Sequence, residues 1–343
     1  MPLSSDVSGP PWPGKLNFRP KCPVCGGPGQ IAYRGLIDAC FSAPGEWGFS
    51  KCWEDDCGVL WLSPAPAPEE LSRAYREYHT HGKSEERRSS AVRRVYDLCV
   101  DALFYVTGVL SERQRVECMF LENREPGSLL DVGCGRGDFL AHMTQRGWSA
   151  IGVDFDSEAA EVARNANGVY VRVGGIECLD PETDAFDAIT ANHSIEHVVD
   201  PLEFLRCCRR LLKPGGRLVI RTPNADSFGH GRYRNAWRGL EPPRHLCVLT
   251  TRAIRRLASQ SGLRVIECST SPAMAEGILL ASHFIRKFGH MNAVPGGVRG
   301  TVNKMLGPVL AVRAQLAWKT NNASGEEVCA VLCRSDDLTW SAG

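Results

Sequence analysis

The chain has no long uninterrupted apolar segment. The best candidates, around Leu279 and Leu310, are broken by histidine, arginine, glycine and proline, and neither approaches the roughly 18 apolar residues of a membrane-spanning helix. The first 20 residues are rich in proline, serine and glycine and contain no apolar stretch, which is not the pattern of a secretory signal peptide. We therefore predict a cytoplasmic protein with no membrane span.

An excess of one charge sign is also absent. The 343 residues include 40 lysines and arginines and 39 aspartates and glutamates, so the formal net charge is +1. Proteins that bind nucleic acid usually carry a basic excess, and we expect no such partner here. Hydrophobic residues make up 43% of the chain, enough to bury a core, and the length predicts about two domains.

Cysteine, in contrast, is abundant. Fifteen cysteines, an odd number scattered over a long chain, predict reduced thiols rather than a disulfide framework. Two pairs stand close to the N-terminus, Cys22 with Cys25 and Cys52 with Cys57, and a glycine follows each pair. Four thiolates suit a tetrahedral structural zinc ion, and they would leave no open position for catalysis.

The spacing leaves alternatives to this zinc site. Four residues separate Cys52 from Cys57, where two are usual for such knuckles. Cys40 could therefore replace one ligand, or the thiols could bind no metal. The surrounding segment is too small and too polar to fold alone, so a metal would supply the missing stability.

The texture of the sequence divides the chain into four parts. These are a flexible tail (1–20), a cysteine-rich module (21–64), a helical linker or lid (65–125) that includes predicted helices at Glu69–Tyr78 and Glu85–Glu122, and a region of alternating strands and helices (126–335) with a helical insertion at 271–320. Strands that alternate with helices predict an α/β fold with a doubly wound, mostly parallel sheet, here of seven strands.

A glycine-rich turn is the sharpest motif. The apolar strand Leu129–Val132 runs into Gly133, Gly135 and Gly137, and a helix follows. Glycines there allow a tight turn and a close approach of the backbone to a ligand. Asp154 ends the next strand, 21 residues after Gly133. The arrangement predicts a pocket for the ribose of an adenosine.

The acidic residues around the turn choose between two cofactors. In the dinucleotide motif G-x-G-x-x-G the third glycine would stand at position 138, which is Asp138. A carboxylate at that helix start would repel a pyrophosphate. Asp131 adds a second negative charge, which suits the ammonium and sulfonium groups of S-adenosylmethionine. The pocket therefore favours S-adenosylmethionine over NAD.

At this point the chain resembles the class I S-adenosylmethionine-dependent methyltransferases, whose first motif is an acidic residue followed by G-x-G-x-G. The segments Ser194–Pro201 and Leu211–Gly216 also match motifs of the family, in the same order along the chain. The resemblance implies a Rossmann-like fold. The cofactor-binding residues that it implies are Asp131, Gly133, Gly135 and Gly137 at the methionine part, Asp154 at the ribose, Asn192 and His193 beneath the cofactor, and either Glu177 or backbone groups at the adenine. The cysteine block resembles a zinc-ribbon-like leader found in some bacterial members.

The acceptor side is expected after the fifth strand of the sheet. Methyl transfer depends mainly on alignment, and a hydroxyl acceptor would use a general base. His245 is our first candidate for that base and His193 the second, whereas His245 could instead brace its loop. The string Trp237–Leu246 resembles a subgroup associated with glycan or secondary-metabolite pathways and, more loosely, the ubiquinone-biosynthesis O-methyltransferases.

Basic and aromatic residues complete the predicted site. Arg232, Arg234, Arg238 and Arg244 form a dense basic group that could hold a phosphate of a nucleotide-sugar or lipid-linked acceptor, or simply be a solvated loop. Tyr75 and Tyr78 could close over the cofactor as a lid, although surface packing is the simpler interpretation.

The preferred function is methyl transfer to an oxygen of a sugar or other small polar metabolite. The alternatives are an RNA or protein methyltransferase that binds its substrate with the cysteine-rich module and, by fold only, a nicotinamide-dependent oxidoreductase. A non-enzymatic adaptor is disfavoured because Asp131, Asp154 and the glycines are all present.

Overall fold

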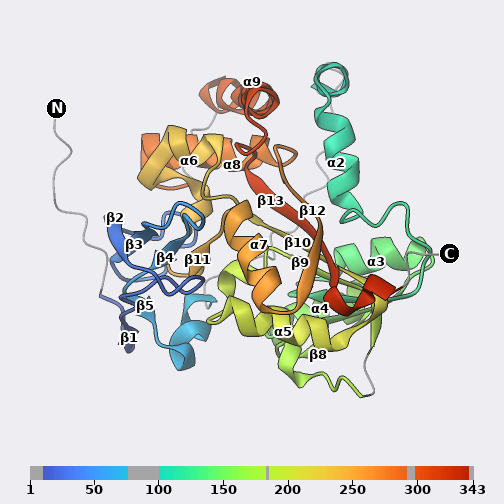
Figure 1. Cartoon of the computed structure of the whole chain (residues 1–343). Helices are drawn as coiled ribbons and strands as arrows, with labels where there is room; N and C mark the ends of the chain where they lie inside the picture. The colour runs from blue at the N-terminus through green and yellow to red at the C-terminus, as the bar shows by residue number, and fades with distance from the viewer. Residues whose placement is uncertain (1–10, 76–99, 183–184, 292–297, 340–343) are drawn as a thin grey trace, which may run out of the picture.

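A mixed seven-stranded sheet forms the centre of the computed structural model, which describes residues 11–75, 100–182, 185–291 and 298–339 (Figure 1). In spatial order its strands are β12 (Leu263–Ser271), β13 (Glu327–Arg334), β10 (Leu212–Pro223), β9 (Phe186–Asn192), β6 (Ser128–Val132), β7 (Ser149–Asp154) and β8 (Tyr170–Val173). The strands from β10 to β8 pair in parallel, whereas β13 is antiparallel to both of its neighbours. The predicted Rossmann-like sheet is confirmed.

Three of the four helices beside this sheet begin at a residue whose side chain caps the helix. The helices that follow strands are α3 (Asp138–Gln145), α4 (Ser157–Asn167), α5 (Pro201–Leu211) and α7 (Thr251–Gln260). Asp156 caps α4, Asp200 caps α5 and Thr250 caps α7, each accepting backbone N–H bonds from the first turn. Such bonds satisfy donors that have no partner within a helix. The central strands between these helices are buried on both faces and therefore read as apolar runs.

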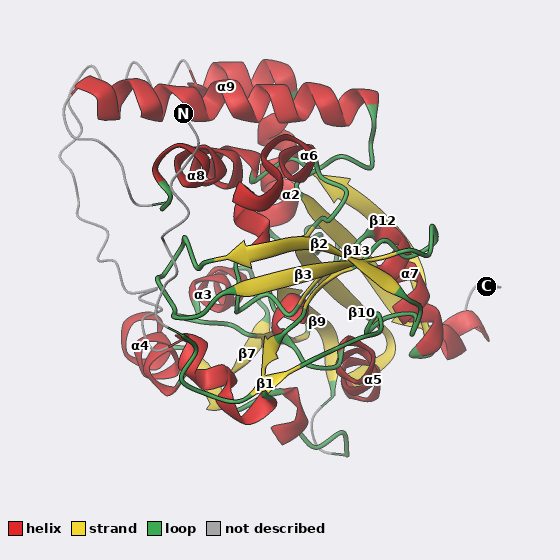
Figure 2. Ribbon diagram, turned by 90° about the vertical axis from the view of Figure 1, so that its left-hand side faces the viewer, coloured by secondary structure: helices red, strands yellow, loops and turns green. Residues whose placement is uncertain are grey.

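A layer of three further helices lies at one end of the sheet. It consists of α6 (Phe228–Tyr233), α8 (Ala275–Phe288) and α9 (Val298–Thr320), and Figure 2 shows α9 running above α8 and α6. The last two occupy the segment predicted as a helical insertion before the final strand. All three pack against one another, and their apolar side chains join those of the N-terminal part of the chain.

The linker differs from the predicted pair of α-helices. Pro68–Tyr75 is a 3₁₀ helix, a form common in short pieces, and Tyr78 lies outside the described residues. Much of the predicted second helix, Glu85–Glu122, also lies outside them. In its described part, Gly108 adopts a left-handed φ of 82° immediately before α2 (Val109–Glu117). One continuous helix to Glu122 was therefore wrong, because such a φ interrupts helical geometry.

The cysteine-rich segment shares its sheet with the later part of the chain. A four-stranded antiparallel sheet has the order β11 (Cys247–Val248), β4 (Leu60–Leu62), β3 (Trp47–Cys52) and β2 (Gly29–Leu36). A two-stranded ribbon of β1 (Leu16–Asn17) and β5 (Ala65–Pro66) lies beside it. A segment this small cannot bury a sufficient core by itself. It obtains one from residues that follow β10, among them Trp237, Leu240 and Val248.

A buried ion-pair network, which we call the Arg244 clasp, fastens the two parts together. The Arg244 side chain is fully buried and donates to Asp38 Oδ1 at 2.8 Å, to Glu241 Oε1 at 2.9 Å and to the Ala74 carbonyl at 3.0 Å. Asp38 also accepts three backbone N–H bonds from its own loop. Every charge in the clasp thus has hydrogen-bond partners, which a buried ion pair requires.

We expect Asp38→Ala to lower the free energy of unfolding by about 3–5 kcal/mol, because it leaves the Arg244 guanidinium buried without its carboxylate partner. Asp56→Ala is the matched control: Asp56 pairs with Arg256 at 3.1 Å, but its side chain is 73% exposed, so the loss should stay below about 1 kcal/mol. Urea denaturation measures both. Equal losses would contradict the role assigned to the clasp.

Candidate functional site

The glycine turn after β6 leaves an open cradle at its centre. A Cβ added to Gly133 would lie 2.6 Å from Ser194 Oγ, and one added to Gly137 would lie 2.6 Å from a methyl group of Val169. At Gly135, where φ is +53°, a Cβ would meet no protein atom within 4 Å. The outer glycines therefore permit protein packing, whereas Gly135 faces space that a ligand can occupy.

Asp154 lies against this cradle, as the sequence predicts for a ribose-binding carboxylate. Its Oδ2 accepts a bond of 2.7 Å from the Gly135 backbone N–H, and its Oδ1 accepts one of 2.9 Å from the Asp156 N–H. The residue is only 8% exposed, and burial raises the pKa of its carboxyl group. The side chain is thus oriented before any ligand arrives.

Asp131, two residues before Gly133 on β6, supplies a second buried carboxyl group. It is 3% exposed and accepts a bond of 2.7 Å from the Thr190 hydroxyl. Burial raises its pKa to about 7, against the effect of that hydrogen bond. A cationic ligand group beside Asp131 would favour the ionised form. The donor set therefore fits a ligand that carries an ammonium or a sulfonium.

Glu177, predicted at the adenine, lies on a short 3₁₀ helix (Ile176–Cys178) and is exposed. Its carboxylate folds back over Gly175, where an added Cβ would lie 2.3 Å from Glu177 Oε2. The adenine contact stays a prediction.

His193 is held between two buried carboxylates. Its Nδ1 donates to Glu196 Oε1 at 3.0 Å and its Nε2 to Glu327 Oε1 at 2.7 Å. Burial would lower the pKa of His193, but these two carboxylates outweigh it and raise the pKa to about 9. At neutral pH the ring is therefore an imidazolium with both N–H groups engaged, and it offers no free lone pair to an acceptor.

Glu327 escaped the sequence analysis. It is the first residue of β13, 134 residues after His193, and the antiparallel register places it opposite Pro223 at the end of β10. Burial alone would raise the pKa of Glu327. The nearby charges of Arg221 and His193 have the larger effect, so its pKa is lowered. No local motif marks such a residue, because its position depends on strand pairing.

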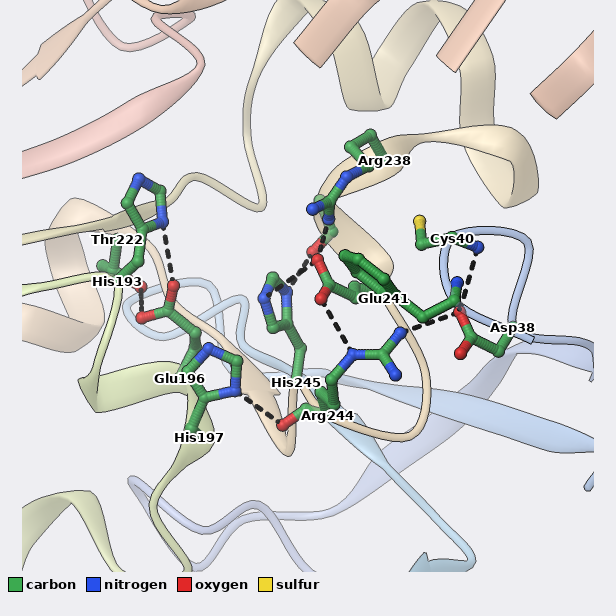
Figure 3. A network of polar contacts seen from close by, with 12 residues as sticks. Asp38, Cys40, His193, Glu196, His197, Thr222, Arg238, Glu241, Arg244 and His245 are labelled. Carbon is green, nitrogen blue, oxygen red and sulfur yellow. Dashed lines mark hydrogen bonds and ion pairs between the residues drawn. The ribbon is translucent and has the colours of Figure 1, made fainter. Parts of the chain in front are cut away.

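His245, the first candidate for the base, lies in an enclosed position (Figure 3). It is 4% exposed, and its Nδ1 lies 2.8 Å from the Gly239 carbonyl, to which it donates. Its ring meets that of His197 edge-on at 4.8 Å. Burial and the nearby His197 hold the pKa of His245 well below the ordinary value. These contacts favour the alternative interpretation, a loop brace, while the catalytic role stays a prediction.

Glu196, His197 and His245 have potential ligand atoms within 4.8 Å of one another. Their hydrogen-bonding groups are largely in use: Glu196 bonds His193 and the Thr222 hydroxyl, and each of the two histidines places Nδ1 on a backbone carbonyl. We therefore describe this group as a hydrogen-bond network. Tyr75 joins it, 3.0 Å from His197 Nδ1 and edge-on to the Phe155 ring at 5.1 Å.

A pocket of about 340 Å³ opens at the carboxyl ends of β9 and β10. Its lining combines apolar and polar side chains, namely Val116, Glu117, Met119, Phe139, His142, Asn192, Arg221 and Met274. Arg221 donates to the Asn192 side chain at 2.8 Å, so the predicted Asn192 is fixed by a residue that the sequence analysis missed. Ligands of open α/β sheets bind at this edge.

The predicted basic group of four arginines does not form one surface. Arg244 is buried in the clasp, and Arg238 pairs with Glu241 beside it. Only Arg232 and Arg234 are exposed. Buried carboxylates neutralise Arg238 and Arg244. The order of residues along the chain does not reveal these partners.

The four predicted cysteine ligands are brought together. The sulfurs of Cys22 and Cys57 lie 3.6 Å apart, those of Cys25 and Cys52 lie 3.4 Å apart, and all four sulfurs are within 4.8 Å. Tetrahedral zinc with Zn–S bonds of about 2.3 Å places sulfurs about 3.8 Å apart, so the set fits zinc. Cys40 lies elsewhere, in the loop that Asp38 organises.

Part of the chain is similar to known proteins. Residues 109–268 match a family described as a methyltransferase domain. The ubiquinone biosynthesis O-methyltransferase of Xanthomonas oryzae pv. oryzae is 41% identical over 102 residues, 28% of this chain and 43% of that protein. The human mitochondrial protein of the same name is 36% identical over 125 residues, 32% of this chain and 34% of that protein. The chain thus spans less than half the length of these curated relatives.

The solved structures include a putative sarcosine dimethylglycine methyltransferase from Galdieria sulphuraria. It is 16% identical, with a TM-score of 0.42 over 71% of this chain and 87% of that one, and a likeness at this level carries no argument about function. The family match covers residues 109–268, and the sheet order agrees with the Rossmann-like fold that such a domain implies. Within the described ranges, no helix is long and apolar enough to cross a membrane.

Because the pKa of Asp131 is raised, we expect cofactor affinity to depend on pH. If its carboxylate meets the ammonium of S-adenosylhomocysteine, affinity should increase as the pH rises through about 7, because the carboxyl group must lose its proton to bind the cation. Calorimetry should show this dependence in the wild type and in Asp226→Asn, a surface control. Asp131→Asn should bind more weakly and lose it. A wild-type affinity that does not change with pH would reject the placement of the ammonium.

Proposed function

We propose that this protein transfers the methyl group of S-adenosylmethionine to an oxygen of a small polar acceptor such as a sugar. The observation that carries the proposal is the juxtaposition of two features at one edge of the sheet. One is the Gly135 cradle with its two buried carboxyl groups, and the other is the pocket at Asn192 and Arg221. The first fits a cationic adenosine cofactor, and the second has the volume of a small-molecule site.

The negative charge at the N-terminus of α3 disfavours a dinucleotide cofactor. Asp138 begins α3 and is exposed at the helix N-terminus, where it bonds the Asn167 side chain at 3.0 Å. A pyrophosphate would need that N-terminus free of negative charge. Support for transfer to oxygen comes from the two ubiquinone biosynthesis O-methyltransferases, which match 28% and 32% of this chain. The pocket volume supports a small acceptor over RNA or protein.

The residues of the chain would act mainly by positioning. When bound, S-adenosylmethionine supplies an activated methyl group on sulfur. The Asn192–Arg221 pair would orient the acceptor, and Glu327, which contacts both Arg221 and His193, would help to keep that pair in place. His193 itself is charged and doubly hydrogen-bonded, so it is a poor base in this state.

We place the general base at His142, a residue that the sequence analysis did not single out. It lies on α3, lines the pocket and is exposed to it. The acceptor hydroxyl would give its proton to a ring nitrogen of His142 as the oxygen–methyl bond forms and the methyl–sulfur bond breaks. His245 remains the competing candidate. Because its ring is enclosed, we expect its replacement to lower stability rather than turnover.

A transfer assay with labelled S-adenosylmethionine tests the function. Label should move into small molecules that pass an ultrafiltration membrane retaining protein and RNA, and it should resist mild alkali, as methyl ethers do and methyl esters do not. Wild-type protein with boiled protein as control is sufficient. Label retained with RNA or protein would instead establish the macromolecular alternative.

The two histidines form a matched pair of variants. His142→Ala should lower turnover by about 10²–10⁴-fold with unchanged S-adenosylhomocysteine affinity, and added imidazole should restore part of the rate. His245→Ala should retain most of its turnover but lower the free energy of unfolding by about 1–3 kcal/mol, since the buried Gly239 carbonyl loses its donor. The reverse pattern would return the catalytic role to His245.

We also propose that the four-cysteine group holds one structural zinc ion. The sulfur spacing supports it, and the Thr250 hydroxyl donates to the Cys57 carbonyl at 2.6 Å, which links the group to the β11–α7 corner. Removal of a metal from such a site loosens the structure that it organises.

Elemental analysis should therefore find about one zinc per chain. Chelation should increase hydrogen exchange in residues 21–64 and in β11 before it does so in β6 or β9. Cys22→Ser should lose the metal, whereas Cys40→Ser, the control, should retain it. A metal-free preparation with full protection of residues 21–64 would disprove the zinc site.

A further inference from the structure

The helical layer α6–α8–α9 carries charge of almost one sign. In the described side chains of these helices, the cations are Arg232, Arg286, Lys287, Arg313 and Lys319, and the one carboxylate is Glu276. Glu276 pairs with Arg113 of α2 at 2.9 Å. A chain with a net charge of only +1 therefore concentrates positive charge in one layer.

Two arginines lie near the Tyr233 ring, and the Lys287 ammonium lies 5.1 Å from the ring centre of Phe288. The Arg286 guanidinium lies 4.8 Å from the Tyr233 ring centre, and that of Arg232 lies 5.8 Å from it. Arg313 of α9 adds its charge to this group: the positive charges of Arg286, Arg232 and Arg313 oppose the rise that burial causes in the Tyr233 pKa.

His283 lies within the same group. Burial lowers the pKa of its ring, and the charges of Lys287, Arg286 and Arg232 lower it further. We call this set the α6–α8–α9 basic cluster: Arg232, His283, Arg286, Lys287 and Arg313.

The cluster lacks the carboxylate partners that other arginines of this protein have. Among the described residues, none of its four cations makes an ion pair, whereas Arg113, Arg244 and Arg252 each do. Neighbouring like charges repel, so an anion bound among them would be stabilised by several cations at once. The acidic group that faces Tyr233 is Glu326, which is fully buried and whose pKa burial raises to about 7.

The position of the cluster links it to the candidate site. Glu326 Oε1 accepts a bond of 2.6 Å from the Gly229 N–H near the start of α6, and its neighbour Glu327 holds His193. On α8, Met274 caps the helix and lines the pocket, while Arg286 lies twelve residues further on, about 18 Å along the helix axis. An extended acceptor could therefore occupy both places.

We infer that the α6–α8–α9 basic cluster binds the phosphate or diphosphate group of a small acceptor whose other end enters the pocket at Asn192 and Arg221. The inference rests on the proposed function and names its substrate class. Arginine forks match phosphate oxygens in pairs, and three helices that pack together bring these cations into one layer.

Calorimetry with inorganic pyrophosphate tests the inference on the full-length protein. Arg232→Gln combined with Arg286→Gln should weaken pyrophosphate binding by about tenfold or more, and binding to the wild type should weaken with added salt. The matched control, Arg206→Gln combined with Arg264→Gln, removes the same charge from exposed positions on α5 and β12 and should bind as the wild type does. Both double variants should keep the wild-type affinity for S-adenosylhomocysteine.

Failure of the wild type to bind pyrophosphate, or an equal loss in the control, would overturn the inference. So would tighter binding of single-stranded RNA or of phosphatidylglycerol vesicles that depends on Arg232 and Arg286, since the surface would then serve a macromolecule or a membrane. A wild type that binds pyrophosphate but not S-adenosylhomocysteine would support the anion site and reject the proposed function.

Discussion

The buried guanidinium of Arg244 connects three parts of the chain that are far apart in sequence. It bonds Asp38 in the cysteine-rich part, Ala74 at the end of the linker and Glu241 in the loop after β10. Desolvating these charges is unfavourable, and full pairing compensates for it. The clasp therefore selects one relative placement of the parts, and the loop containing His245 depends on it.

The strand pairing reinforces this placement. Since β11 follows His245 directly and pairs with β4, the loop that carries His245 is bounded by the clasp on one side and by a sheet on the other. The four-cysteine group reaches the same corner through Thr250. A metal ion held by the four cysteines would therefore be connected through Thr250 to the corner where β11 and α7 meet.

A second compensated network surrounds His193. The buried carboxylates of Glu196 and Glu327 and the buried Arg221 guanidinium lie together with the half-buried His193 ring at the ends of β9, β10 and β13. The opposite charges in contact favour the ionised forms of His193, Glu196 and Glu327, against the effect of burial. The charges of this network nearly cancel at the edge of the pocket that Asn192 and Arg221 line.

Local sequence determined the sheet, the glycine turn, Asp131, Asp154 and the proximity of the four cysteines, because strand periodicity, glycine conformation and thiol spacing act over short stretches of chain. Through a resemblance, it also predicts that Asn192 and His193 lie beneath the cofactor, and this stays a prediction. Tertiary structure alone decided which charges are free: it buried Arg244 with Asp38, brought Glu327 to His193, placed His142 and Arg221 in the pocket, and gathered Arg232, Arg286 and Arg313 from three helices. These contacts join residues tens to hundreds of positions apart. The free energy of a buried charge depends on what surrounds it in space, which no local pattern of residues records.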